Sequence, residues 1–406
     1  MKMKRLILAF MLVAAFMLVA SCGNGAEEAA ATPTPAPDAV AQEDPADDDD
    51  DGGEEDYAAL PAEAGIRIAI VTSSSGVDDG SFNQNNYEGI LEFIRSTSPA
   101  STVQHVHETT GVPANAVEAV ENIVAEFDII VMPGFQFGGV GRVASENTGT
   151  YFIMIDAWPD GFDQGLPNMR ALLFAEQESG FMAGIAAALE TTTGYVAFVG
   201  GMPIPPVVNY HLGFVSGVNY ANTHLGTNAT LVDLAPFAGI EVIFGNNIGG
   251  NYANDFAAVD VGLTIGNALI AENVDVIFVA AGLTGVGVFN AVQMDGGDVM
   301  VIGVDVDQFD QGVGAGGANI VLTSALKVMD INVYRSLQDF YNGTWQGGNY
   351  VMTADTDSTG IVTAPGRHQM SASTVSEVDR IFALLRNGDI VPASNFIHSP
   401  DNFPGL

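Results

Sequence analysis

The sequence of 406 residues is poor in basic residues: 12 Lys and Arg stand against 49 Asp and Glu, which gives a formal net charge of −37. Binding to the phosphates of nucleic acids needs clustered Lys and Arg, so nucleic acid is excluded as a partner. A basic patch that could dock on an anionic membrane surface is missing for the same reason. Because 48% of the residues are hydrophobic, disorder along the whole chain is also excluded.

Cysteine is nearly absent as well: Cys22 is the single one, so the chain has no disulfide framework. It follows an apolar run from Leu6 to Ala20 that has basic residues before it and is shorter than the roughly 20 residues of a transmembrane helix. A lone cysteine after a small-residue stop resembles the lipobox of bacterial lipoproteins. We expect a lipoprotein signal peptide over 1–21 and a lipidated Cys22 that anchors the protein on the extracytoplasmic face of a bacterial cell membrane. A plain secretory signal is the alternative.

Residues 22–64 have the composition of a tether. Fourteen acidic residues and no Lys or Arg lie between positions 23 and 64, together with many Ala and Pro. Like charges repel, and such a composition cannot bury a core, so we expect an extended, disordered segment. The run Asp47 to Asp51 lacks the spaced ligands and glycine turn of a calcium loop, so we assign no metal to it.

From residue 66 onward, short apolar runs alternate with helical stretches, which predicts βαβ units and parallel sheets. The predicted strands are Ile66–Val71, Val103–His107, Ile129–Met132, Tyr151–Ile155, Ala171–Phe174, Tyr195–Val199, Glu241–Phe244, Val274–Val279 and Met300–Val304. The predicted helices are Asn83–Arg95, Ala114–Glu126, Ser179–Thr191, Val207–Asn222, Asn254–Glu272, Gly285–Met294, Thr323–Tyr341 and Val375–Asn387. Nine strands exceed one ordinary open sheet, and the pattern restarts near Tyr195, so two doubly wound lobes are the simplest α/β arrangement.

The motifs of common enzymes are missing. The sequence has no P-loop, no H-E-x-x-H and no G-x-S-x-G, and Gly285-Val286-Gly287 lacks the acidic residue that a dinucleotide site wants about 20 residues later. His105 and His107 face one side of a predicted strand, but two ligands do not make a metal site. We therefore assign no catalytic residue, metal or cofactor.

Several motifs resemble the basic membrane lipoprotein family, whose members are substrate-binding proteins of ABC transporters of the purine nucleoside-binding type. The resemblance starts at 68–72 and 77–84 (V-D-D-G-S-F-N-Q) and continues through 133–135, 152–156, 178–184 and 198–202. It resumes at 281–285, 301–308 and 322–327 (L-T-S-A-L-K). The resemblance implies a type I periplasmic-binding fold with two Rossmann-like lobes, three crossovers and a ligand cleft. We expect the N-terminal lobe at 65–174 and about 306–345, and the C-terminal lobe at 175–305 and about 346–406.

The resemblance also implies ligand-binding residues. Phe82 matches an aromatic residue that stacks on the base, with Asn83 as its polar neighbour, and Tyr252 matches a second aromatic residue on the other face. Asp156, at the end of an apolar strand, can accept hydrogen bonds from base N–H groups. Each has a structural alternative: helix packing for Phe82, an ordinary loop position for Tyr252 and helix capping for Asp156.

Asp305 and Lys327 match the ribose-binding pair of the family. Asp305 follows a strand, and Lys327 is expected early in a helix that begins near Thr323. Lysine occurs at 2, 4 and 327 alone, so removal of the signal peptide would leave Lys327 as the single lysine. Its alternative role is that of a buried counter-ion for Asp305. Gly282 and Gly285 would let the backbone approach the sugar closely.

One position departs from the family: Ser73 stands where an aspartate usually contacts the base, which leaves the exact nucleoside open. The expected function is capture of a purine nucleoside by hinge closure and its delivery to an ABC permease and ATPase, without enzymatic activity. The first alternative is a receptor of the same fold for another small solute, such as a sugar, a nucleobase or a signalling molecule. The second is a surface enzyme that acts on nucleosides.

Overall fold

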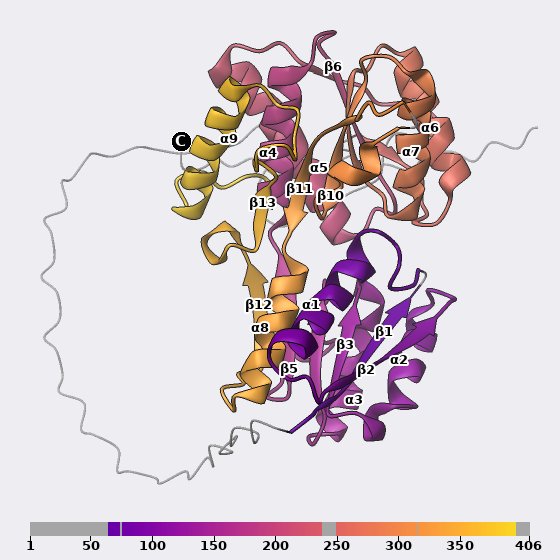
Figure 1. Ribbon diagram of the computed structural model, residues 1–406, viewed down its shortest axis with the longest axis vertical. Helices are drawn as coiled ribbons and strands as arrows, with labels where there is room; N and C mark the ends of the chain where they lie inside the picture. Colours follow the sequence, from indigo (N-terminus) through magenta and orange to yellow (C-terminus); the bar gives the residue numbers. More distant parts are fainter. Residues whose placement is uncertain (1–63, 74, 238–248, 315, 395–406) are drawn as a thin grey trace, which may run out of the picture. The chain divides into compact units, whose positions relative to one another are not determined.

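The computed structural model describes residues 64–73, 75–237, 249–314 and 316–394. The predicted signal peptide, Cys22, nearly all of the predicted tether and the strand expected at Glu241–Phe244 lie outside these residues. In the described part, helices and strands form two mainly parallel sheets, one of six strands and one of seven. This confirms the α/β arrangement in two lobes (Figure 1). Among the described residues, no helix combines the length and the apolar character that crossing a membrane requires.

The first lobe is built on a parallel sheet in the order β12-β5-β4-β3-β1-β2. Its strands are β1 (Arg67–Ser73), β2 (Thr102–Glu108), β3 (Ile129–Pro133), β4 (Tyr151–Ile155), β5 (Met169–Phe174) and β12 (Gly348–Met352). Its helices are α1 (Phe82–Ser96), α2 (Pro113–Glu121), α3 (Gly141–Glu146) and α8 (Met329–Tyr341), with short 3-10 turns at Val124–Glu126 and Phe135–Val140. Alternate residues of β1 enter different cores: Ile68 and Ile70 pack with α1 and α8, whereas Ala69 and Val71 pack with α2. Both faces are therefore buried, as parallel strands require.

The second lobe is built on a sheet in the order β13-β11-β10-β9-β6-β7, with β8 paired to β6 and β13 antiparallel to β11. Its strands are β6 (Tyr195–Gly200), β7 (Thr230–Leu231), β8 (Asn251–Tyr252), β9 (Val276–Ala280), β10 (Met300–Asp305), β11 (Val321–Lys327) and β13 (Thr359–Ile361). Its helices are α4 (Glu176–Glu190), α5 (Pro205–Tyr220), α6 (Val259–Ala271), α7 (Leu283–Asp295) and α9 (Ala372–Arg386). A π-helical turn η3 (Ala221–Leu225) and the 3-10 turns η4 (Phe309–Gly312) and η5 (Ala354–Thr356) complete it.

Helices α4 and α5 pack at backbone distance because glycines line their contact. A Cβ on Gly184 would lie 2.2 Å from the carbonyl oxygen of Phe214, and one on Gly217 would lie 2.1 Å from that of Phe181. Any larger residue would force the two helices apart. The motif at 178–184 is part of the family resemblance, and its glycines are thus required by the packing of the two helices.

The prediction of a helix from Thr323 was wrong. Residues Val321–Lys327 form β11 inside the second sheet, and α8 begins only at Met329. Val321 and Thr323 are β-branched, a type that fits a pleated sheet better than a helix. Lys327 is consequently the last residue of a strand rather than an early residue of a helix.

The division of the C-terminal third also differs from the expected boundaries. The segment from 306 to 327 was expected in the first lobe, but η4 and β11 belong to the second. Strand β12, expected in the second lobe, pairs with β5 in the first (Figure 1). In the described residues the chain passes between the sheets three times: at Ala175, at Val328 and between β12 and β13.

The first turn of α4 connects these three crossovers by hydrogen bonds. The Ser179 hydroxyl donates to the carbonyl oxygen of Leu326 at 2.7 Å and accepts from the N–H of Gly360 at 3.0 Å. The carboxylate of Glu178 accepts from the N–H of Ala354 at 2.8 Å and from the Thr359 hydroxyl at 2.6 Å. The segments that join the lobes are therefore held to one another.

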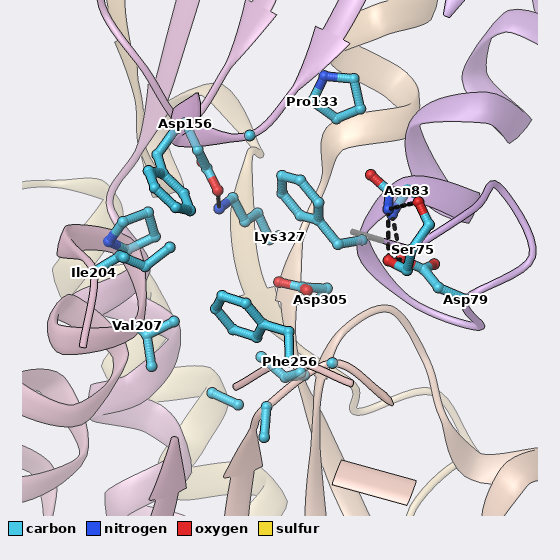
Figure 2. A pocket seen from close by; sticks show the side chains of 18 of the residues that line it. Ser75, Asp79, Asn83, Pro133, Asp156, Ile204, Val207, Phe256, Asp305 and Lys327 are labelled. Atoms are coloured by element: carbon cyan, nitrogen blue, oxygen red, sulfur yellow. Dashed lines mark hydrogen bonds and ion pairs between the residues drawn. The ribbon is translucent and has the colours of Figure 1, made fainter. Parts of the chain in front are cut away.

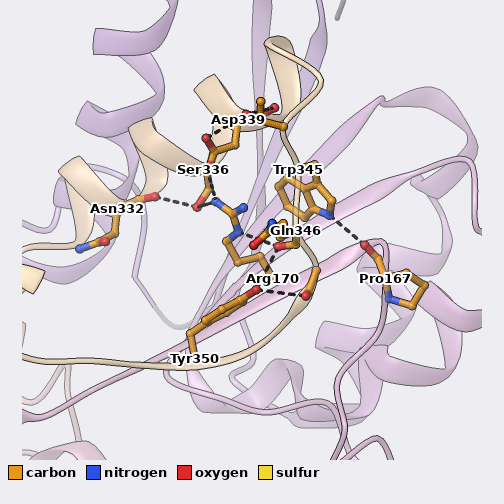
Figure 3. Close-up of polar contacts among 10 residues, drawn as sticks. Pro167, Arg170, Asn332, Ser336, Asp339, Trp345, Gln346 and Tyr350 are labelled. Carbon is orange, nitrogen blue, oxygen red and sulfur yellow. Dashed lines mark hydrogen bonds and ion pairs between the residues drawn. The ribbon is translucent and has the colours of Figure 1, made fainter. Parts of the chain in front are cut away.

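Arg170 on β5 fastens the returning segment α8–β12 to the first lobe (Figure 3). Its guanidinium donates to Asp339 Oδ2 at 2.8 Å and to the carbonyl oxygen of Gln346 at 3.1 Å. It also lies 4.7 Å from the centre of the Trp345 ring, whose N–H donates to the carbonyl oxygen of Pro167 at 2.9 Å. Two segments far apart in sequence are thus joined through one side chain.

Replacement of Arg170 by Met is expected to lower the free energy of unfolding by about 2 kcal/mol, because it leaves partly buried acceptors without donors. The measurement is the urea midpoint followed by circular dichroism. The matched control is Arg95→Met, whose side chain is 67% exposed and pairs with Glu92 within one helix. That change should cost less than about 0.5 kcal/mol. Equal losses in the two variants would contradict a special role for Arg170.

Candidate functional site

A cavity of about 800 Å³ lies between the two lobes, at the carboxyl ends of their parallel strands (Figure 2). This is where ligands bind to doubly wound sheets. The first lobe contributes Ser75, Asp79, Phe82, Asn83, Pro133, Gly134, Phe135, Gln136 and Asp156. The second contributes Ile204, Pro206, Val207, Tyr210, Phe256, Ala280, Ala281, Gly282, Val304, Asp305 and Lys327.

The loop between β1 and α1 places Phe82 in this cavity. Asp79 accepts from the backbone N–H groups of Ser81, Asn83 and Gln84 at 3.0 to 3.1 Å, which satisfies donors at the start of α1. The Asn83 amide donates to the hydroxyl of Ser75 at 2.8 Å and to its carbonyl oxygen at 3.1 Å. Phe82, the first residue of α1, is thereby held at the cavity wall. Ser73 ends β1, and the serine that lines the cavity is Ser75.

From the segment that contains the predicted Tyr252, the aromatic residue that lines the cavity is Phe256, and Phe135 and Tyr210 line it as well. Tyr252 is 1% exposed, and its hydroxyl is hydrogen-bonded to His211 Nδ1 at 3.0 Å inside the second lobe. It is not among the described residues that line the cavity. Phe256, four residues later in the same loop, lines it from the lobe opposite Phe82. An aromatic residue just beyond Asn254-Asp255 was visible in the sequence, but nothing there distinguished it from Tyr252.

Asp156 follows β4 in the left-handed backbone region, with a φ of 62°. It is 8% exposed, and its Oδ2 accepts from the ammonium group of Lys327. Its Oδ1 has no hydrogen-bond partner among the described residues. Because Asp156 lines the cavity, this oxygen is an acceptor available to a ligand.

Lys327 is a buried cation, but it forms ion pairs with Asp156 and Glu176 rather than with Asp305, the partner in its alternative role. Its ammonium group lies 2.9 Å from Glu176 Oε1 and 5.3 Å from the ring centres of Phe82 and Phe174. Glu176, which the sequence analysis missed, is the first residue of α4 and is also hydrogen-bonded by the Asn209 amide at 3.2 Å. Its place in the sequence, two residues after a strand that ends at a crossover, was the signal that could have identified Glu176.

Asp305 ends β10, again in the left-handed region, with a φ of 65°. Its Oδ1 accepts from the hydroxyl of Tyr210 on α5 at 3.1 Å, and its Oδ2 accepts from the Ser81 hydroxyl of the first lobe at 3.2 Å. Burial raises the pKa of Tyr210 well above its usual value, so this hydroxyl stays a donor. Asp305 thus connects the two lobes at the cavity.

Among the described residues that line it, the cavity gathers more carboxylate charge than its one cation, Lys327, compensates. Burial raises the pKa of Asp156 from 3.8 to about 7, although Lys327 partly offsets this. Burial also raises the pKa of Asp305. Burial alone would lower the pKa of Lys327, but Asp156, Glu176 and Asp305 together raise it, so the ammonium group stays charged. Such a site favours ligands that donate hydrogen bonds and disfavours anions.

The two predicted glycines take different positions. Gly282 precedes α7 with a φ of 55° and lines the main cavity. Gly285 lies one helical turn later and lines a second, adjoining cavity. His105 and His107 lie on β2 with ring centres 5.7 Å apart. Within the described ranges, no group of three or more His, Cys, Asp or Glu side chains could hold a metal ion.

Two Rossmann-like lobes, three crossovers and a cavity with buried carboxylates between the strand ends define a solute-binding protein of the periplasmic type I class. Residues 66–233 and 247–381 match the family described as ABC transporter substrate-binding protein PnrA-like. The chain therefore belongs to this family, as its motifs indicated.

Relatives and solved structures agree with this assignment. The chain is 31% identical over 342 residues to the CD4+ T-cell-stimulating antigen of Listeria monocytogenes, an alignment that spans 80% of this chain and 87% of the relative. It is 26% identical to the ABC transporter nucleoside-binding protein BmpA of Lactococcus lactis, across 70% and 78% of the two chains. A solute-binding protein of an ABC transporter system from Aeropyrum pernix superposes with a TM-score of 0.68 at 23% identity, covering 82% of this chain and 94% of the other. That likeness confirms the fold.

The raised pKa of Asp156 predicts a pH dependence of stability. A carboxyl group whose pKa is higher in the folded than in the unfolded state binds its proton more tightly when folded. Its contribution is therefore lost as the pH rises from about 4 to about 7. Asp156→Asn removes this titration. Relative to the wild type, the unfolding free energy of the variant should therefore gain roughly 2 kcal/mol between pH 5 and pH 8.

Urea titrations across this pH range measure the difference. The control is Asp379→Asn, at an exposed position of α9 outside the cavity. Profiles of wild type and Asp156→Asn that run parallel over the whole range would contradict the assignment.

Proposed function

We propose that this ABC transporter substrate-binding protein captures purine nucleosides and delivers them to its permease and ATPase. The observation that carries the proposal is one cavity that combines two phenylalanines from opposite lobes with carboxylates at both strand edges. Phe82 and Phe256 offer flat apolar faces for a base. Asp156 Oδ1 is an unoccupied acceptor for a donor group, and Asp305 can accept from vicinal hydroxyls of a ribose. The name of the Lactococcus lactis relative supports the same ligand class.

In this proposal the mechanism is closure of the two lobes around the ligand. Each lobe supplies part of the cavity, so a ligand that contacts both makes the closed state more favourable than the open one. The hydrogen bond from Ser81 to Asp305 joins the lobes beside the cavity. The crossovers, held together by the first turn of α4, act as the hinge. The ligand is bound and released unchanged.

The proposal extends to the location of the protein. Processing after residue 21 and lipidation of Cys22 would anchor it on the extracytoplasmic face of a bacterial cell membrane, with the acidic residues up to 64 as a tether. The succession of basic residues, an apolar run and a lone cysteine supports the proposed anchor and location.

Isothermal titration calorimetry with adenosine, guanosine, inosine and uridine tests the ligand class. We expect at least one purine nucleoside to bind more tightly than uridine, because the larger base covers more of the two phenylalanine faces. Asp305→Asn should weaken that nucleoside about tenfold and the free base much less, because a neutral amide accepts more weakly from the ribose hydroxyls.

Phe82→Leu is the matched variant that tests binding of the base. It should weaken the nucleoside and the free base by the same factor, since both lose the aromatic face. Absence of binding for all four nucleosides at verified folding would remove the proposal. Equal losses of nucleoside and base in Asp305→Asn would remove the ribose role alone.

A further inference from the structure

A second cavity of about 510 Å³ adjoins the main one on the side of Gly282. The two cavities share Asp79, Ala281, Gly282 and Val304 as lining residues, so they adjoin. None of the motifs that carried the proposed function required this space, although Gly285 lines it. Because the second cavity lies next to Asp305, it lies beside any ligand group that Asp305 binds.

The wall of this second cavity is uncharged for the most part. Its floor is apolar and consists of Val279, Val304 and Phe289, which are 2%, 5% and 6% exposed. Its rim carries the side-chain amides of Asn290 and Gln293 on α7 and of Gln308 and Gln311 near η4. An apolar floor with an amide rim suits an uncharged substituent.

Glutamines bridge the lobes beside this cavity. Gln311 donates to the carbonyl oxygen of Gly80 in the first lobe at 2.8 Å, and Gln308 donates to Gln311 Oε1 at 2.9 Å. Arg367 holds the turn that carries Gln311, through Asp307 at 2.6 Å and Asp310 at 2.8 Å. The cavity therefore persists when the lobes are in contact.

Asn290 is the rim amide with free hydrogen-bonding capacity, because its side chain makes no hydrogen bond with another described residue. The charges nearby are negative. Asp79 lines the cavity, and its two oxygens already accept from the loop before α1 and from the start of α1. No Lys or Arg is among the described residues that line this space. An anionic group would meet Asp79 and Asp305 without a compensating cation.

We propose that the second cavity is a subsite for an uncharged substituent on the sugar of the bound nucleoside, and that it rejects phosphate. The inference rests on the proposed function, because Asp305 must hold the vicinal hydroxyls for the 5′ carbon to point past Gly282. The ligand class then includes nucleosides whose 5′ hydroxyl is replaced by a small thioether or alkyl group.

The test is calorimetry with three ligands on each of three bases: adenosine, guanosine and inosine, their 5′-deoxy-5′-methylthio derivatives and their 5′-monophosphates. For the base that binds, the methylthio derivative should bind within about tenfold of the parent, and the monophosphate at least about a hundredfold more weakly. Failure of all three parents overturns the proposed function. If a parent binds, a methylthio derivative that loses more than about tenfold, or a monophosphate that loses less than about a hundredfold, overturns the subsite alone.

A variant that fills the cavity gives a second readout. Asn290→Tyr should lower the affinity for the methylthio derivative at least about tenfold more than the affinity for the parent. Met294→Tyr is the matched control, since Met294 lies on the same helix and is 77% exposed; it should change both affinities equally. A ratio below about tenfold for Asn290→Tyr contradicts the subsite. If that variant does not fold, the comparison of the three ligands on the wild type still decides.

Discussion

The candidate site depends on one ammonium group, that of Lys327, and on the carboxylates around it. Lys327 ends a strand of the second lobe, Asp156 ends a strand of the first, and Glu176 begins the helix that follows a crossover. Removal of a buried cation from such a group typically costs about 3–5 kcal/mol, which is a large part of the roughly 5–15 kcal/mol by which a folded protein is stable. The position of the strand ends and the charge of the cavity therefore both depend on the ion pairs of Lys327.

The same constraint explains the chemical character of the site. A single cation faces three carboxylates, so the cavity remains negative and keeps an acceptor, Asp156 Oδ1, without a partner in the described residues. An unsatisfied acceptor at this depth costs free energy that a ligand's donor group would recover. Affinity for hydrogen-bond donors and rejection of anions are two consequences of this one imbalance.

The connections around the cavity separate rigid parts from parts that can move. Glu178 and Ser179 tie the crossovers to one another, while Ser81 and Gln311 contribute single hydrogen bonds between the lobes away from them. Single hydrogen bonds of this kind are far easier to break than the packed cores on either side. Motion about the crossovers is the one that leaves both sheets intact.

Much of the fold was predictable because its signals are local. Apolar runs such as 129–132 on both faces of a strand, alternating with helical stretches, indicate parallel sheets wherever they occur. Phe82, Asn83, Asp156, Asp305, Gly282 and Lys327 were singled out because they stand in motifs that resemble a family, and all of them line the cavity. The helix expected from Thr323 failed because a segment as short as 321–327 is consistent with strand or helix until its hydrogen-bond partner is known.

The sequence by itself determined the α/β class and the two-lobe arrangement and predicted six of the residues at the cavity, since these depend on patterns along the chain. The tertiary structure alone decided the partners. It paired Lys327 with Asp156 and Glu176, placed Phe256 rather than Tyr252 in the cavity and returned β12 to the first sheet. The physical reason is that burial and ion pairing depend on which side chains meet across the two lobes, and no spacing within one segment specifies that.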